Sequence, residues 1–195
     1  MSEIFEAAYS AGGNPRAESG FGGGEARWEA GRRPIADAVD RPGTFLDIGC
    51  ANGHLLECLV RWSPHPIEPY GLDLAPGLVA LARRRLPQWS ERFFVGNAAT
   101  WDPPRRFDVA RTELVYVPGE RQRAFVERLL ARVVAPGGRL IVCGYGSPRS
   151  GLAADPVGAI LRSHGFEPEL EREVEAPEGG GPIVVLACLR APDTS

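Results

Sequence analysis

From residue 44 onward, short apolar runs alternate with amphipathic segments of helical length, and this alternation constrains the fold more than any other feature. The apolar runs are residues 44–50, 69–74, 92–97, 106–112 and 139–145. The segments of helical character are residues 53–62, 76–87, 119–138 and 155–166. Strands that alternate with helices of this length form a parallel sheet covered on both faces. Continuous apolar runs agree, because parallel strands are buried on both sides.

The end of the chain breaks this pattern. Residues 167–176 and 182–190 read as two strands joined only by the turn "PEGGG", so we expect an antiparallel hairpin. Ahead of the sheet, residues 25–40 look helical, and Pro34 is expected to start a second short helix or to kink the first. The predicted fold class is therefore α/β: a doubly wound, mostly parallel seven-stranded sheet with an antiparallel C-terminal strand pair and helices on both faces.

The stretch "FLDIGCANGHL" at residues 45–55 reads as the first of these strands, which ends in an acidic residue, followed by a turn with Gly49 and Gly53. Ligands of doubly wound sheets bind at the carboxyl ends of the strands, so the turn stands in the right place for a nucleotide. A phosphate-binding P-loop needs a lysine, and the chain has none. A dinucleotide fingerprint needs glycine where this turn has Ala51 and His54, and both obstruct a pyrophosphate. The turn is thus expected to hold a nucleotide without a pyrophosphate against the backbone.

Polar groups at the ends of the next two strands suggest how a nucleoside would be held. Asp73 stands about one β-α-β unit after the turn, where a carboxylate can accept both hydroxyls of a ribose. Asn97 could accept a hydrogen bond from an adenine amino group, and Ala98 could offer its backbone N–H to a ring nitrogen. Asn97 could instead be a simple turn residue.

At this point the sequence resembles a known family. The blocks "FLDIGCANG", "YGLDL", "FVGNAA", "RFDVARTELVYVP" and "LLARVVAPGGRLIV" are similar, in order and spacing, to those of the class I S-adenosylmethionine-dependent methyltransferases. The resemblance covers roughly residues 40–190 and implies S-adenosyl-L-methionine as the cofactor. It departs from the family at Ala51, where glycine is usual, and at Asn97, where aspartate is commoner.

The resemblance also implies site residues. Asp47 would orient the turn and hold the amino end of the cofactor, while Gly49 and Gly53 allow close approach of the backbone. Asp73 would bind the ribose, and Leu74 would lie against the adenine. The cofactor-binding residues expected in total are Arg27, Asp47, Gly49, Cys50, Ala51, Gly53, Asp73, Leu74, Asn97, Ala98 and Arg111.

The methyl acceptor is expected beyond the fourth strand, in "ARTELVYVPGER" at residues 110–121. An acceptor hydroxyl or ammonium must lose a proton, and Glu113 or Tyr116 could take it. The alternative is that Glu113 caps the following loop and Tyr116 packs. No carboxylate cluster follows this strand, so no metal is expected.

We expect two units: residues 1–40 as a mobile N-terminal lid and helix, and residues 41–195 as the cofactor-binding methyltransferase domain. The segment 10–25 is rich in glycine yet carries Phe21, and it is followed by Arg27 and Trp28. Arg27 would meet the methionine carboxylate, while the two aromatic rings exclude water from the sulfonium. The alternative is a leader followed by a helix that merely packs on the sheet.

The net charge and the composition limit the classes of partner that this chain can be expected to bind. The net charge of −3 over 195 residues makes nucleic acid an unlikely substrate, and no apolar run approaches membrane-spanning length. The start of the chain lacks the features of a signal peptide, and the four cysteines form no C-x-x-C pair, so buried reduced thiols and a cytoplasmic location are expected. The chain is expected to be a monomer or a homodimer.

The function predicted from these observations is S-adenosylmethionine-dependent methyl transfer to a small-molecule acceptor, such as a secondary metabolite, directed to oxygen or nitrogen. Two alternatives stay open: a nucleic-acid or protein methyltransferase, and a non-catalytic module that keeps the fold and binds the cofactor.

Overall fold

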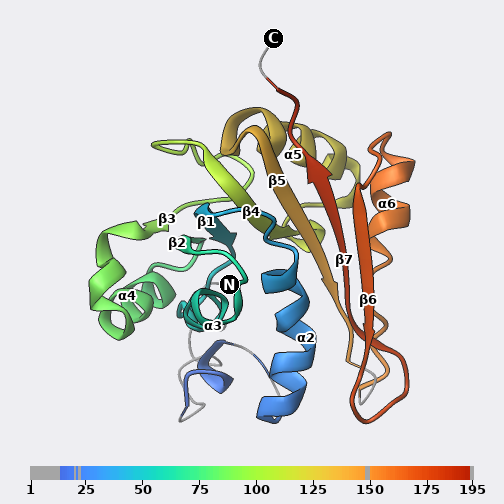
Figure 1. Ribbon diagram of the computed structural model, residues 1–195, viewed down its shortest axis with the longest axis horizontal. Helices are drawn as coiled ribbons and strands as arrows, with labels where there is room; N and C mark the ends of the chain where they lie inside the picture. The colour runs from blue at the N-terminus through green and yellow to red at the C-terminus, as the bar shows by residue number, and fades with distance from the viewer. Residues whose placement is uncertain (1–13, 20, 22, 148–149, 194–195) are drawn as a thin grey trace.

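The computed structural model describes residues 14–19, 21, 23–147 and 150–193. Within these residues a single seven-stranded sheet has the order β3-β2-β1-β4-β5-β7-β6 (Figure 1). The strands are β1 (Gly43–Ile48), β2 (Ile67–Asp73), β3 (Phe93–Val95), β4 (Phe107–Glu113), β5 (Val134–Tyr145), β6 (Leu170–Glu175) and β7 (Pro182–Arg190). The α-helices are α2 (Glu25–Asp37), α3 (His54–Trp62), α4 (Pro76–Arg85), α5 (Gln122–Arg128) and α6 (Val157–Ser163). Short 3-10 segments are η1 (Ala17–Ser19), η2 (Pro87–Arg92), η3 (Leu114–Tyr116) and η4 (Gly119–Arg121), and η5 (Leu129–Val133) is a π-helical turn.

The sheet confirms the predicted fold class. Strands β1 to β5 pair in parallel, whereas β7 runs antiparallel to both β5 and β6. The chain winds from β1 out to β3 and then returns to place β4 on the other side of β1. This reversal between β1 and β4 is the switch point where doubly wound sheets bind ligands.

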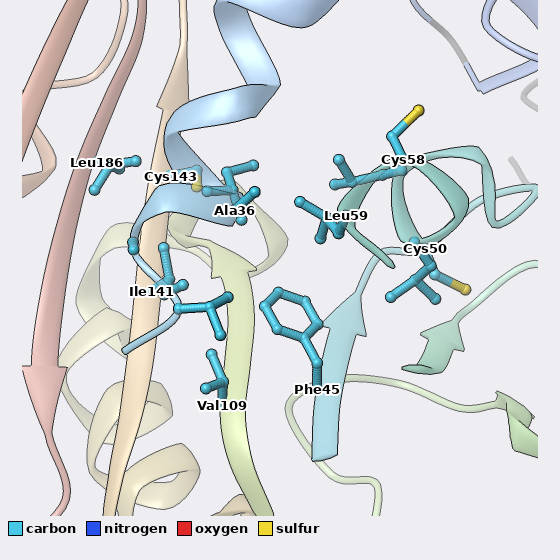
Figure 2. Close-up of a cluster of buried hydrophobic side chains, with 14 of the residues drawn as sticks. Ala36, Phe45, Cys50, Cys58, Leu59, Val109, Ile141, Cys143 and Leu186 are labelled. Carbon is cyan, nitrogen blue, oxygen red and sulfur yellow. The ribbon is translucent and has the colours of Figure 1, made fainter. Parts of the chain in front are cut away.

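Helices cover the two faces of the sheet in separate groups. Alternate residues of a strand face opposite sides, so Phe45 and Leu46 belong to different hydrophobic clusters. Helices α2, α3 and α4 bury their apolar faces in the Phe45 cluster, and α5 and α6 bury theirs in the Leu46 cluster. Figure 2 shows the first cluster, with Ala36 of α2 and Leu59 of α3 near Phe45 and Ile141.

Two local expectations need correction. Helix α2 is one continuous element that includes Pro34, so no second helix begins there, and the proline, which lacks an N–H to donate, stands in the last turn. Residues 119–138 are not one long helix: the helical segment ends at Val133, and Val134 already pairs with Phe107 of β4. The buried β-branched valines favour the strand, and Gly137 supplies a positive φ of 64° beyond them.

Within the described residues no helix has both the length and the apolar character that a membrane crossing requires. All four cysteines are buried and free, and none of them pairs with another.

Candidate functional site

A cavity of about 630 Å³ opens at the carboxyl ends of β1, β2, β3 and β4. Its volume lies in the range typical of small-molecule and cofactor sites. It is lined by Ser19, Ile48, Gly49, Ala51, Leu72, Asp73, Leu74, Ala75, Leu78, Gly96, Asn97, Ala98, Glu113, Val115 and Tyr116. Because β3 and β4 are three strand spacings apart, the lining strand ends span roughly 14 Å, which suits an elongated ligand.

The turn after β1 forms the floor of this cavity and has an unusual backbone. Gly49, Ala51 and Gly53 all have positive φ, and Ala51 is the one non-glycine residue of the described chain with this conformation. A Cβ placed on Gly49 would overlap the Tyr116 hydroxyl, so this position needs glycine. The N–H groups of Gly49 and Cys50 both donate to the Leu72 carbonyl, at 2.7 and 3.1 Å, which ties the turn to β2.

Asp73 ends β2 and is held by the backbone. Its Oδ2 accepts the Ala51 N–H at 2.8 Å, and its Oδ1 accepts the Ala75 N–H at 2.9 Å. Burial raises the pKa of this carboxyl, and the backbone donors oppose that rise. Each carboxylate oxygen can accept a second hydrogen bond, so a pre-oriented acceptor pair faces the middle of the cavity.

At the end of β3, Asn97 adopts the turn that was the alternative to an adenine contact. Its Oδ1 accepts the Ala99 N–H at 2.9 Å, an Asx turn. The backbone N–H of Ala98 has no hydrogen-bond partner among the described residues, although Ala98 lines the cavity. At this end the backbone therefore offers a donor, while the Asn97 side chain shapes the turn.

The β4 end is built from ionic side chains instead. Arg111 is buried and donates to Asp47 at 3.2 Å, to Glu113 at 2.5 Å and to the Tyr145 hydroxyl at 2.9 Å. The Tyr116 hydroxyl donates to the same Glu113 oxygen at 3.0 Å. We call these five side chains the Arg111 network; they come from β1, β4, η3 and β5.

The Arg111 network has more negative than positive charge. Burial raises the pKa of Asp47 to about 6, and the nearby Arg111 only partly offsets this. Burial also raises the pKa of Tyr116 well above its ordinary value, so the hydroxyl stays protonated and can donate. Asp47 Oδ2 and Arg111 Nε are buried without a hydrogen-bond partner among the described atoms.

The structure brings most of the predicted site residues together, but five of them lie outside the cavity surface. Asp47 and Arg111 stand directly behind it, as just described. The Cys50 side chain points into the core near Phe93, and Gly53 begins α3. Among predicted residues, those that line the cavity are Gly49, Ala51, Asp73, Leu74, Asn97, Ala98, Glu113 and Tyr116.

Arg27 departs furthest from its expected place. Helix α2 directs it to an ion pair with Glu178 in the turn between β6 and β7, and it does not line the cavity. The Trp28 ring likewise stacks on His54 at 5.0 Å, and Phe21 packs edge-on against Trp28 at 5.2 Å. These side chains belong to the packing of α2 on the core rather than to the cavity wall.

The segment before α2 approaches the turn in a different way. Asn52 donates to the Pro15 carbonyl at 2.8 Å, and Ser19 lines the cavity. Residues 10–13, 20 and 22 of the expected lid lie outside the described residues.

Some site residues escaped the sequence reasoning. Tyr145 joins the Arg111 network from the end of β5, and its ring packs under Arg32 of α2 at 3.7 Å. Val115 lines the cavity mouth. A polar residue at the carboxyl end of a neighbouring strand was the available signal for Tyr145.

Comparisons with known proteins agree with the position of this cavity. A family model described as "Methyltransferase domain" matches residues 45–138, the stretch from β1 into β5 that carries most of the cavity. Residues 45–138, just under half of the chain, are therefore similar to a methyltransferase domain. The match begins inside β1, just before the glycine-bearing turn, and covers the carboxyl ends of β1 to β4.

Relatives and solved structures agree with this domain. A trans-aconitate 2-methyltransferase of Methylobacterium nodulans is 37% identical over 117 residues, which cover 56% of this chain and 43% of that protein. The chain thus aligns with under half the length of this relative. The N-methyltransferase NodS of Bradyrhizobium japonicum, in complex with S-adenosylhomocysteine, superposes with a TM-score of 0.71 at 18% identity over 98% of both chains. The 1,6-didemethyltoxoflavin-N1-methyltransferase of Burkholderia thailandensis gives a TM-score of 0.67 at 20% identity, over 98% of this chain and 87% of that one.

Proposed function

We propose that this protein transfers a methyl group from S-adenosyl-L-methionine to a small-molecule acceptor, at an oxygen or a nitrogen atom. The observation that carries the proposal is that Gly49, Asp73 and Ala98 line one cavity, which presents backbone without a side chain, a carboxylate and an unpartnered N–H at the ends of three adjacent strands. The methyltransferase domain match over residues 45–138 supports it independently.

The residues present fit this cofactor. Gly49 lines the cavity and carries no side chain, so a ligand can approach the backbone of the turn, while the Tyr116 hydroxyl lies where a Cβ would stand. The remaining lone pairs of Asp73 suit two ribose hydroxyls, and the unpartnered Ala98 N–H suits a ring nitrogen of adenine. Exposed Leu74 offers an apolar surface for the flat base.

When bound, the cofactor supplies an electrophilic methyl group on a sulfonium sulfur. The chain must then align the acceptor and take up its proton. Glu113 lines the cavity at the β4 end and is the carboxylate that we assign to this proton. Tyr116 orients Glu113 through its hydroxyl, and Arg111 holds it from behind.

We also infer that residues before α2 act as a lid. The contact of Asn52 with Pro15 and the position of Ser19 in the cavity wall support this for residues 14–19. Helix α2 is part of the packed core, so the lid is confined to residues before it. Deletion of residues 1–24 should weaken cofactor binding and abolish turnover while the core folds. Unchanged affinity, together with the same protease sensitivity with and without cofactor, would refute the lid.

Isothermal titration tests the cofactor assignment directly. We expect micromolar binding of both S-adenosylmethionine and S-adenosylhomocysteine, about −8 kcal/mol. A folded sample that gives no heat with either ligand contradicts the proposal. Binding without transfer of a labelled methyl group to metabolite extracts would favour a non-catalytic binding module instead. Label found in added RNA, DNA or protein would point to a macromolecular acceptor.

A further inference from the structure

The charge on the cavity wall restricts which acceptor can bind. Two carboxylates line the cavity, Asp73 and Glu113, and the third ionisable group of the wall is the Tyr116 hydroxyl, which stays protonated. No arginine or histidine of the described chain contributes to this wall. The remaining lining residues are apolar or neutral, and Leu74 and Val115 at the mouth are 66% and 64% exposed.

Arg111 stands behind the wall but cannot serve an anionic ligand. A guanidinium has four terminal N–H groups. The two on one nitrogen point to Asp47 and the Ile48 carbonyl, and the two on the other point to Glu113 and Tyr145. The side chain is 3% exposed, and its Nε is buried. Its positive charge is already shared by two carboxylates.

Glu113 has one oxygen to offer. Its Oε1 accepts from both Arg111 and Tyr116, whereas Oε2 has no partner among the described residues. The Glu113 side chain is 21% exposed and lines the cavity. Oε2 is therefore a suitable acceptor for an N–H donor of a bound molecule, and it repels a carboxylate.

We propose that the methyl acceptor is an amine, neutral or cationic, with an apolar body, that Glu113 Oε2 binds its nitrogen, and that the site rejects polycarboxylates. The proposal rests on the proposed methyltransferase function and names its substrate class. It separates this chain from its relatives named for trans-aconitate, a compound with three carboxylates. The apolar body of the amine lies against Val115 at the cavity mouth.

The chemistry balances with this assignment. An ammonium first gives one proton to Glu113, which passes it to water, and the nitrogen lone pair becomes available. That lone pair forms the bond to the methyl carbon. The carbon–sulfur bond breaks with its electron pair staying on sulfur, which leaves a neutral thioether and a methylated nitrogen.

Matched pairs of compounds test the proposal on the full-length chain. Each pair shares one apolar skeleton and ends in an amine or a carboxylate, for example tryptamine and indole-3-propionate; trans-aconitate is added as a tricarboxylate. Binding is measured by titration into protein saturated with S-adenosylhomocysteine, and turnover is measured by transfer of labelled methyl. We expect the amine of a pair to bind at least about tenfold more tightly than the carboxylate, and we expect label only in amines.

Two variants assign the preference to this site. Glu113→Gln should reduce amine affinity about tenfold while cofactor affinity is retained. Val115→Arg adds a cation at an exposed position of the mouth, so it should weaken amine binding and improve binding of the carboxylate partner. Val60→Arg, an equally large change at an exposed position of α3 outside the cavity wall, is the matched control and should change neither.

The outcomes separate the two proposals. Lack of cofactor binding overturns the proposed function itself. If cofactor binding is intact, any one of three results overturns the amine assignment alone. These are label in trans-aconitate, tighter binding of the carboxylates than of the amines, and no binding of the amine in any pair. Equal amine affinity in the Glu113→Gln and wild-type proteins also overturns it.

Discussion

The two ends of the cavity are built by different means. At the β1 to β3 end, backbone groups hold the site: Asp73 is fixed by the N–H groups of Ala51 and Ala75, and Ala98 presents its own N–H. At the β4 end, buried side chains hold one another in the Arg111 network. A site held by backbone geometry depends on short local motifs, whereas a site held by buried charges depends on every partner at once.

The largest expected effect on stability comes from removing the cation of the charged end. Arg111→Met leaves Asp47 and Glu113 without a cation, and an uncompensated buried charge is costly. The free energy of unfolding, measured in urea at pH 7, should fall by about 3–5 kcal/mol. Arg123→Met is the control, because its pair with Glu127 is exposed and should contribute less than about 1 kcal/mol. A loss no larger than that of the control would show that the network does not stabilise the fold.

Protonation of Asp47 should have the next largest effect on the free energy of unfolding. Its folded pKa of about 6 lies above its ordinary value of 3.8, so the folded state binds the proton more tightly. The resulting stability is fully present below pH 3.8 and is lost as pH rises through 6. Relative to Asp47→Asn, the wild-type protein should therefore gain up to roughly 3 kcal/mol between pH 7 and pH 4. A pH-independent difference between the two unfolding free energies would mean that Asp47 titrates normally.

Asp73→Ala tests the backbone-held end. The change removes both acceptors that we assign to the ribose hydroxyls and should weaken cofactor binding by roughly 2–3 kcal/mol, thirty-fold or more. It also frees the Ala51 and Ala75 N–H groups, so thermal unfolding is recorded first. Asp102→Ala, the same change in an exposed loop, should bind the cofactor as the wild type does. A folded Asp73→Ala protein with unchanged affinity would make the ribose assignment wrong.

The smallest expected effect on stability concerns a single hydrogen bond at the charged end. Tyr116→Phe keeps the ring beside Gly49 and removes only the hydrogen bond to Glu113. The free energy of unfolding should fall by about 1 kcal/mol, the usual net value of one hydrogen bond. A loss as large as that of Arg111→Met would instead show that the Tyr116 hydroxyl completes the network.

The fold and the backbone-held end could be predicted from sequence because their signals are local. Alternating apolar runs specify strands buried on two faces, and the residues after each strand necessarily meet at one edge of a parallel sheet. Gly49 and Ala98 follow such strands and Asp73 ends one, so the sequence predicts that they lie at one edge, and all three line the cavity. Their assigned contacts with the cofactor stay predictions.

The charged end and the N-terminal helix depended on tertiary structure. Arg27 precedes the sheet in sequence, yet α2 packs so that this side chain reaches Glu178, 151 residues later. Tyr145 meets Arg111 because β5 lies beside β4, and Asp47 meets it because β1 lies on the other side of β4. The sequence alone determined which residues end each strand. Only the packing of separate strands and helices decided which buried charges share a partner, because a hydrogen bond between distant residues leaves no periodic or local pattern in the chain.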